Sequence, residues 1–168
     1  TTFPKSFDMS IPNITSELRQ FAQAIHIDKD LNIAGHSLGG SVATVYASQY
    51  PFDTQSLFLL SSAGIYKQAN TRYAKDPKTL KNLLVYKQGD FEQVIQKLMT
   101  TPPKVPSELK AAQEHILISK SSKTNQAIDQ IVKLNRIYTP DTFAQLTRNV
   151  EAPTLIMWGK QDQIINYE

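Results

Sequence analysis

The sequence contains no cysteine, which excludes disulfide bonds and thiolate metal sites and leaves the compartment undetermined, either cytoplasmic or exported. No apolar run approaches the roughly 20 residues that a bilayer-spanning helix needs. The N-terminus shows no basic start followed by an apolar stretch and a cleavage site. No basic cluster is interleaved with aromatic residues, which argues against a nucleic-acid partner. These absences predict a soluble chain without a transmembrane segment.

The composition that remains is ordinary for one globular domain of 168 residues, with 40% hydrophobic and 20% charged residues. The formal net charge of +3 is unevenly distributed. Residues 66–150 contain fourteen Lys or Arg against seven Asp or Glu, whereas the rest of the chain is net negative. A basic surface can attract anionic membranes or anionic substrates. Scattered lysines on helices are more typical of a solvated face, which we favour here.

A glycine-rich hexapeptide is the most informative motif. Residues 35–40 read Gly-His-Ser-Leu-Gly-Gly and lie between an apolar run at 31–34 and a helix-like stretch at 41–47. This is the G-x-S-x-G pattern of a nucleophile elbow in its strand-turn-helix setting. A glycine-rich turn can also bind phosphate, but neither phosphate-binding spacing fits these residues. The motif therefore favours a serine nucleophile over an ordinary turn.

Within this motif Ser37 is the candidate nucleophile. We expect that a side chain at Gly35 or Gly39 would clash across so tight a turn, and that the small residues let Ser37 stand out. The following helix begins just behind the serine, so its N–H groups and positive dipole end lie where an oxyanion develops during acyl transfer. This predicts the Leu38 N–H as one oxyanion donor.

Apolar periodicity divides the chain into three segments. Residues 1–65 predict part of an α/β core in the order helix, strand, helix, strand, at 14–25, 31–34, 41–47 and 56–61, with the elbow after the first strand. Residues 66–150 predict an all-helical cap or lid insertion with helices at 90–99, 107–118 and 127–134, the first two capped by Asp90 and Ser107, and a break at 121–122. Residues 151–168 predict a further core strand and a polar loop that contains Asp162.

Three stretches carry a family resemblance, at 32–40, 56–64 and 152–165. On these residues the chain resembles the α/β-hydrolase superfamily, and within it the capped serine esterases and lipases and the hydrolases that cleave carbon–carbon bonds. The resemblance implies a parallel sheet, three strands of it in this chain, with flanking helices and a helical cap. It implies a truncated form of that fold, and it calls for no cofactor and no metal.

The resemblance also implies a catalytic triad in the chain order serine, acid, histidine. Ser37 matches the nucleophile and Asp162, in the stretch Trp-Gly-Lys-Gln-Asp, matches the acid that would orient the histidine. The alternative for Asp162 is a carboxylate that only satisfies a turn. Leu38 would supply one N–H of the oxyanion hole, and a second would come from a loop of the family fold that is outside this sequence.

No histidine follows Asp162, although the family pattern requires one. The three histidines of the sequence all precede it, and none is expected to be the general base. We expect His36 to point away from the Ser37 hydroxyl and to pack beside the sheet. His26 is predicted at a surface position, and His115 on a helix of the insertion. The resemblance therefore places the base in sequence beyond residue 168.

These observations predict a hydrolase of carboxylic esters that acts on a small-molecule ester or lipid. Two alternatives stay open: a carbon–carbon bond hydrolase or acyltransferase with the same triad, and a non-catalytic relative that binds a ligand or partner. The exposed strand edges predict pairing with another chain or with a missing part of the same protein. The isolated 168 residues are expected to be nearly inactive, since the base and half of the oxyanion hole are absent.

Overall fold

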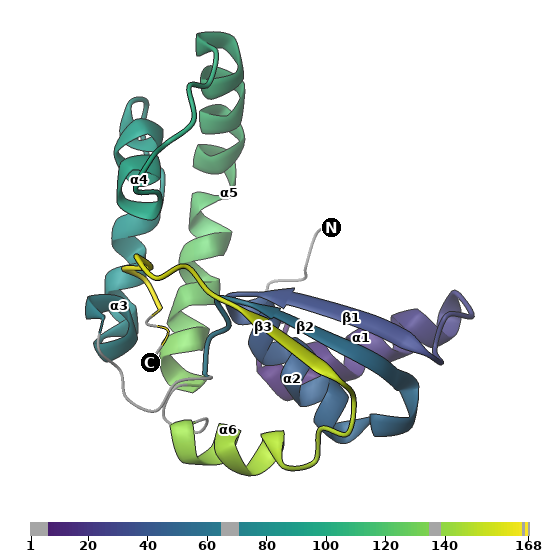
Figure 1. Cartoon of the computed structure of the whole chain (residues 1–168). Helices are drawn as coiled ribbons and strands as arrows, with labels where there is room; N and C mark the ends of the chain where they lie inside the picture. Colours follow the sequence, from purple (N-terminus) through teal and green to yellow (C-terminus); the bar gives the residue numbers. More distant parts are fainter. Residues whose placement is uncertain (1–6, 65–70, 135–138, 166, 168) are drawn as a thin grey trace.

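The computed structural model describes residues 7–64, 71–134, 139–165 and 167. Its sheet has three parallel strands in the order β1-β2-β3, namely Leu31–His36, Thr54–Leu60 and Thr154–Met157. The helices are α1 (Ile11–Ala24), α2 (Leu38–Gln49), η1 (Pro51–Asp53), α3 (Arg72–Lys75), η2 (Pro77–Leu83), α4 (Asp90–Leu98), α5 (Ser107–Leu134) and α6 (Pro140–Thr147). This arrangement confirms the predicted α/β class with a three-stranded parallel sheet (Figure 1).

Helix α2 covers one face of the sheet and packs on β1 and β2. Ala43 and Ala47 of α2 form a buried cluster with Leu57 and Leu59 of β2. Their short side chains let the helix approach the strands closely. Because α2 starts directly after β1, this packing fixes the position of the turn between them.

A second buried cluster joins α1, α2 and α6. Ile11 of α1 packs with Val42 and Val45 of α2 and with Phe143 of α6. Helix α6 therefore contacts the core layer, although it lies within the stretch 66–150 that the sequence assigns to the insertion. Among the helices in the described ranges, none combines the length and the apolar character that a membrane crossing demands.

The opposite face of the sheet carries exposed side chains. Burial alternates along β1, so that Asn32, Ala34 and His36 point away from α2 and are exposed. All four residues of the edge strand β3 are exposed, and Leu155 and Ile156 keep more than half of their accessible surface. In the part of the chain that the structure describes, this face and both sheet edges are thus open.

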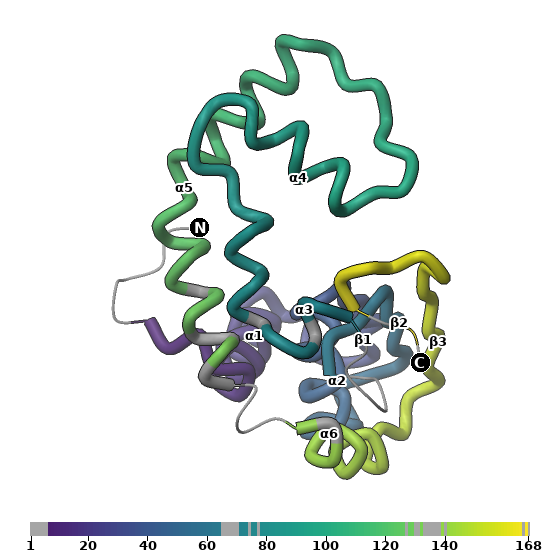
Figure 2. The backbone as a smooth tube through the Cα atoms, turned by 90° about the vertical axis from the view of Figure 1, so that its left-hand side faces the viewer, coloured from purple at the N-terminus to yellow at the C-terminus, as the bar shows by residue number. Residues whose placement is uncertain are grey.

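Helices α4 and α5 form an arm that projects away from the sheet (Figures 1 and 2). The predicted break at 121–122 is wrong, because α5 is one continuous helix of 28 residues. The hydroxyls of Ser119, Ser121 and Thr124 donate to carbonyls about one turn earlier, at distances of 2.7 to 3.1 Å. These polar side chains are satisfied within the helix and so do not interrupt it.

The start of α4 also differs from the prediction. Gly89, with φ +92°, is the capping residue, and Asp90 is the first residue of the helix. The Asp90 carboxylate instead accepts hydrogen bonds from the N–H groups of Tyr86 and Lys87, both at 3.0 Å. These two bonds favour the charged form and lower the pKa of Asp90. The carboxylate thus stabilises the loop before α4 rather than the helix end.

A side chain of α5 accepts hydrogen bonds from the N–H groups at the start of α4. Glu114 of α5 accepts from the N–H groups of Gly89 at 2.6 Å and of Phe91 at 3.1 Å. The glutamate is only 9% exposed. A buried carboxylate that satisfies unpaired helix N–H groups joins the two helices of the arm more firmly than apolar contact alone.

Candidate active site

Ser37 occupies a strained turn between β1 and α2. Its backbone has φ +53° and ψ −123°, a region that non-glycine residues rarely adopt, at a cost of about 1–3 kcal/mol. Three hydrogen bonds maintain it: the Ser37 N–H donates to the Leu60 carbonyl (3.2 Å), and the Ser37 carbonyl accepts from Gly40 and Ala63 (3.0 Å each). The hydroxyl does not cap α2. The geometry is therefore the sharp strand-to-helix bend that the motif predicts.

Two glycines permit this bend, and one of them is not the predicted one. A Cβ at Gly35 would lie 2.3 Å from the Gly39 carbonyl oxygen, so no side chain fits there. A Cβ at Gly40 would lie 2.3 Å from the Ser62 hydroxyl. The prediction that a side chain at Gly39 would clash is wrong, because a Cβ there meets nothing within 4 Å. Gly40 rather than Gly39 allows α2 to approach the segment after β2.

A cavity of about 800 Å³ opens beside the turn. Most of its polar residues lie at or after the carboxyl ends of the three strands, namely His36, Ser37, Ser61, Lys160, Gln161 and Asp162, and Thr100 lies after α4. Its apolar residues are Leu80 and Leu83 of η2, Leu98 and Met99 at the end of α4, and Ile164 and Ile165. Ser37 and Asp162 thus line the same cavity, together with apolar residues that come in part from the predicted insertion.

Asp162 lies in the loop after β3, and its two carboxylate oxygens have different surroundings. Oδ1 accepts hydrogen bonds from the N–H groups of Ile164 (2.8 Å) and Ile165 (3.0 Å). The Asp162 N–H donates to the Gly159 carbonyl at 3.0 Å. No hydrogen bond to Oδ2 is formed by any residue in the described ranges. One oxygen therefore satisfies the turn, and the other is left for a further donor.

Side chains from two other positions hold this loop. The Trp158 indole N–H donates to the Ile165 carbonyl at 2.9 Å. The Thr71 hydroxyl, from just before α3, donates to the Ile164 carbonyl at 2.5 Å. Both residues that donate to Asp162 are thus fixed through their own carbonyls as well.

Leu38 is the first residue of α2, where backbone N–H groups have no partner within the helix. The Gly40 N–H is used by the Ser37 carbonyl, but no bond from the Leu38 N–H is formed within the described part of the chain. The Leu38 side chain packs against the cluster of Ile11, Val42 and Val45. This packing fixes the backbone that carries the N–H beside Ser37.

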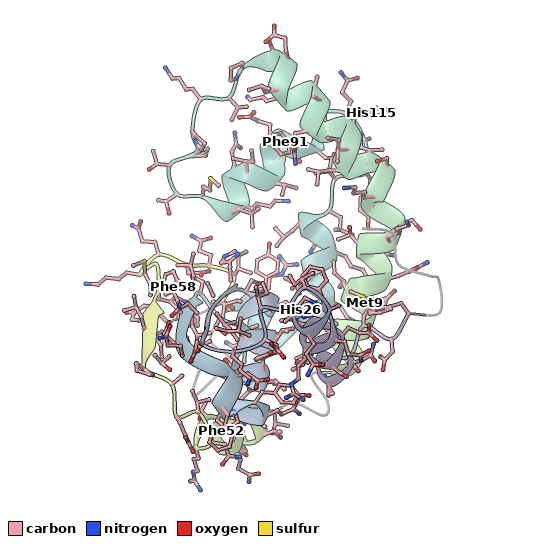
Figure 3. The ribbon with its side chains drawn as sticks, turned by 90° about the vertical axis from the view of Figure 1, so that its right-hand side faces the viewer. Met9, His26, Phe52, Phe58, Phe91 and His115 are labelled. Carbon is pink, nitrogen blue, oxygen red and sulfur yellow. The ribbon has the colours of Figure 1, made fainter. Side chains whose placement is uncertain are left out.

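The histidines do not complete the site. The prediction that His36 packs beside the sheet is wrong: its side chain is exposed and borders the cavity, because the alternation of β1 puts it on the face opposite α2. Within the described residues no hydrogen bond joins His36 to Ser37 or Asp162. His26 and His115 are exposed, do not line the cavity, and lie far apart, His115 on the arm (Figure 3).

A family model for the alpha/beta hydrolase fold matches residues 1–168. The chain belongs to the alpha/beta hydrolase fold family. Lipase 1 of Psychrobacter immobilis is 30% identical over 167 residues, which cover 98% of this chain and 51% of the lipase. This chain spans about half the length of the curated relatives it matches.

Two crystal structures share both the fold and a recognisable sequence. A candidate lipase, lip1 from Acinetobacter baumannii AYE, is 51% identical with a TM-score of 0.94, over 99% of this chain and 56% of that one. A membrane phospholipase A, described as a bacterial virulence factor, is 26% identical with a TM-score of 0.86, over 99% of this chain and 52% of that one. The similar proteins described here thus include lipase-type members of the alpha/beta hydrolase family.

Sequence reasoning missed the apolar wall of the cavity and the Thr71 contact. Leu98 belongs to an apolar stripe that the sequence does show, but Leu80 and Leu83 lie in a 3₁₀ segment with no helical periodicity to reveal them. Thr71 has no local signal, because its partner is 93 residues away in the sequence.

Proposed function

We propose that the protein that carries this chain hydrolyses carboxylic esters of lipids through an acyl-serine intermediate on Ser37. The observation that supports this most directly is the strained turn, which puts Ser37 in the wall of a cavity that Asp162 also lines. Strain of this kind is maintained where the fold needs a side chain in one orientation. An ordinary turn would not need a residue with φ +53° when glycine could occupy it at lower cost.

In the proposed reaction the Ser37 oxygen attacks the ester carbonyl carbon and its proton passes to a histidine. The Leu38 N–H stabilises the oxyanion of the tetrahedral intermediate. The histidine then protonates the leaving alkoxide, and water hydrolyses the acyl-serine by the same steps. Oδ2 of Asp162, to which no described residue donates, accepts from the other ring nitrogen and stabilises the imidazolium.

The general base of this mechanism is proposed to come from residues outside the 168 of this sequence. His36 borders the cavity but lacks a bond to either Ser37 or Asp162 within the described residues, and a base needs hydrogen-bond reach to the nucleophile. The second oxyanion donor is proposed to come from outside as well. We therefore expect negligible hydrolysis by these residues alone, although the turn itself is formed.

The proposed substrate class follows from the cavity wall. Leu80, Leu83, Leu98 and Met99 offer an apolar surface in the cavity that Ser37 lines, which suits the hydrocarbon chain of a fatty acyl group. The volume of about 800 Å³ is within the usual range of small-molecule sites. The three relatives described above are named as lipases and a phospholipase, which favours ester hydrolysis over carbon–carbon cleavage or acyl transfer.

The test is labelling of the full-length protein with a fluorophosphonate probe, which reacts with activated serines. We expect labelling of the wild-type protein and of Ser119→Ala, a control that removes an exposed hydroxyl on the arm. Ser37→Ala should not be labelled and should lose ester turnover by about 10⁴-fold or more. Equal labelling of Ser37→Ala and wild type would refute the assignment. No labelling of the wild type would favour the non-catalytic binding protein.

A further inference from the structure

A single peptide group joins Thr71 to Asp162. The peptide between Ile164 and Ile165 accepts the Thr71 hydroxyl at its carbonyl (2.5 Å) and donates its N–H to Asp162 Oδ1 (3.0 Å). In a planar trans peptide the carbonyl and the N–H point in opposite directions. Thr71 and Asp162 therefore hold the same rigid unit from its two sides.

Thr71 belongs to a distant part of the chain. It immediately precedes α3, and its own carbonyl accepts from the Lys75 N–H at 3.0 Å. Helix α3 contacts η2, which contributes Leu80 and Leu83 to the apolar wall of the cavity. Figure 1 shows α3 beside the segment that follows β3. The bond thus connects the wall of the cavity to the loop that carries Asp162.

We propose that Thr71 is a positioning residue for Asp162. Its hydroxyl fixes the orientation of the 164–165 peptide, and the peptide N–H fixes the carboxylate so that Oδ2 faces the cavity. This inference rests on the proposed function, in which Oδ2 receives the histidine. Hydrogen bonds in series polarise one another, so that loss of the first bond weakens the second.

The other contacts of the loop do not replace Thr71. The Ile164 N–H, which also donates to Oδ1, belongs to the preceding peptide. Trp158 bonds to the Ile165 carbonyl, which belongs to the following peptide. Among the described residues, Thr71 is the only hydrogen-bond donor to the carbonyl of the 164–165 peptide, whose N–H donates to Asp162.

The test compares Thr71→Val, which removes the hydroxyl but keeps the shape, with Thr71→Ser, which keeps it, in the full-length protein. Thr79→Val is the matched control, because the Thr79 hydroxyl donates to the Asp76 carbonyl (2.6 Å) and has no link to Asp162. Ester turnover is measured against pH, together with thermal unfolding and fluorophosphonate labelling. Thr71→Ala removes the same hydroxyl and serves in place of Thr71→Val if the valine variant does not fold.

We expect Thr71→Val to lower kcat about 10-fold with little change in KM, since the acid assists the proton transfer and does not bind substrate. A displaced carboxylate stabilises the imidazolium less, so the histidine pKa falls and the acidic limb of the kcat/KM profile moves to lower pH. Thr71→Ser should restore most of kcat and the wild-type profile, and Thr79→Val should match wild type.

An unchanged pH profile and kcat in Thr71→Val, with a wild type that is labelled at Ser37, would overturn the role of Thr71 alone. The same change in Thr79→Val would also overturn it, because the effect would then be a general loss of stability. A wild type that is not labelled at Ser37 would refute the proposed function and this inference with it.

Discussion

The turn around Ser37 and the loop around Asp162 border the same cavity, but different kinds of contact hold them. Backbone groups hold the turn: Ser37 bonds to main-chain groups at the end of β2 and at the start of α2. Side chains hold the loop, since Asp162, Trp158 and Thr71 each bond to a backbone group of residue 164 or 165. The turn is therefore part of the sheet, whereas the loop depends on contacts with the rest of the molecule.

Substitutions should therefore affect the turn around Ser37 and the loop around Asp162 differently. The backbone contacts of Ser37 lie on the segments that form the buried clusters of α2 and β2, which close packing keeps rigid. The loop that carries Asp162 receives one contact, at the Ile164 carbonyl, from a segment next to α3, which in turn contacts η2. We expect substitutions near α3 to alter the position of Asp162 without affecting Ser37.

The largest loss of ester turnover is expected from Asp162→Asn, which separates the structural role of the Asp162 carboxylate from its charge. Asp162→Asn keeps an oxygen that can accept from Ile164 and Ile165, so the loop should persist, but it removes the charge that would stabilise an imidazolium. We expect ester turnover to fall by about 10⁴-fold while the melting temperature changes little. Both are measured on the full-length protein.

Asp76→Asn is the matched control for that substitution. The Asp76 carboxylate accepts from the N–H two residues later (Lys78, 3.2 Å), as Asp162 does, but it does not line the cavity. We expect Asp76→Asn to keep normal turnover. If Asp162→Asn also kept its turnover, Asp162 would be a turn residue only, and the cavity would need another acid.

The next largest effect is a loss of stability, expected from a substitution at Gly35 in the turn. Gly35→Ala places a methyl group 2.3 Å from a backbone oxygen that cannot move without shifting α2, and we expect a loss of about 3 kcal/mol or more in unfolding free energy. Gly39→Ala has free space and lies within α2, so its stability should stay within about 1 kcal/mol of wild type. Urea unfolding of both variants makes the comparison. Equal losses would mean that the two glycines are both required.

The difference between contacts among neighbours in the chain and contacts with distant residues explains which features the sequence predicts. The strain of the turn arises between neighbours in the chain, so a short pattern around Ser37 is enough to predict it. Even there, the pattern does not distinguish Gly39 from Gly40, because the residue that would clash with Gly40 is Ser62, which follows another strand. Strands β1 and β2 were likewise predictable from short apolar runs, whereas their parallel arrangement was implied by the family resemblance.

Features that depend on distant contacts were not predictable from local patterns. The break expected in α5 at 121–122 is absent for a local reason instead, because the Ser121 hydroxyl bonds to the Ile118 carbonyl within the continuous helix. The contact of Thr71 was not predictable because its partner, the Ile164 carbonyl, lies 93 residues away in the sequence. The direction of His36 follows from which face of β1 the helix α2 covers, which the strand pattern alone does not specify.

The smallest effect is expected from Trp158→Phe, which removes one side-chain contact of the loop. The Ile165 carbonyl loses the indole N–H, and a lost hydrogen bond of this kind costs about 1 kcal/mol of unfolding free energy. Because this carbonyl belongs to the peptide after the one that donates to Asp162, we expect kcat to fall less than in Thr71→Val. Unfolding in urea and ester turnover measure the two effects. A stability loss larger than that of Gly35→Ala would reverse the comparison, since the loop and not the turn would then be the more firmly held segment.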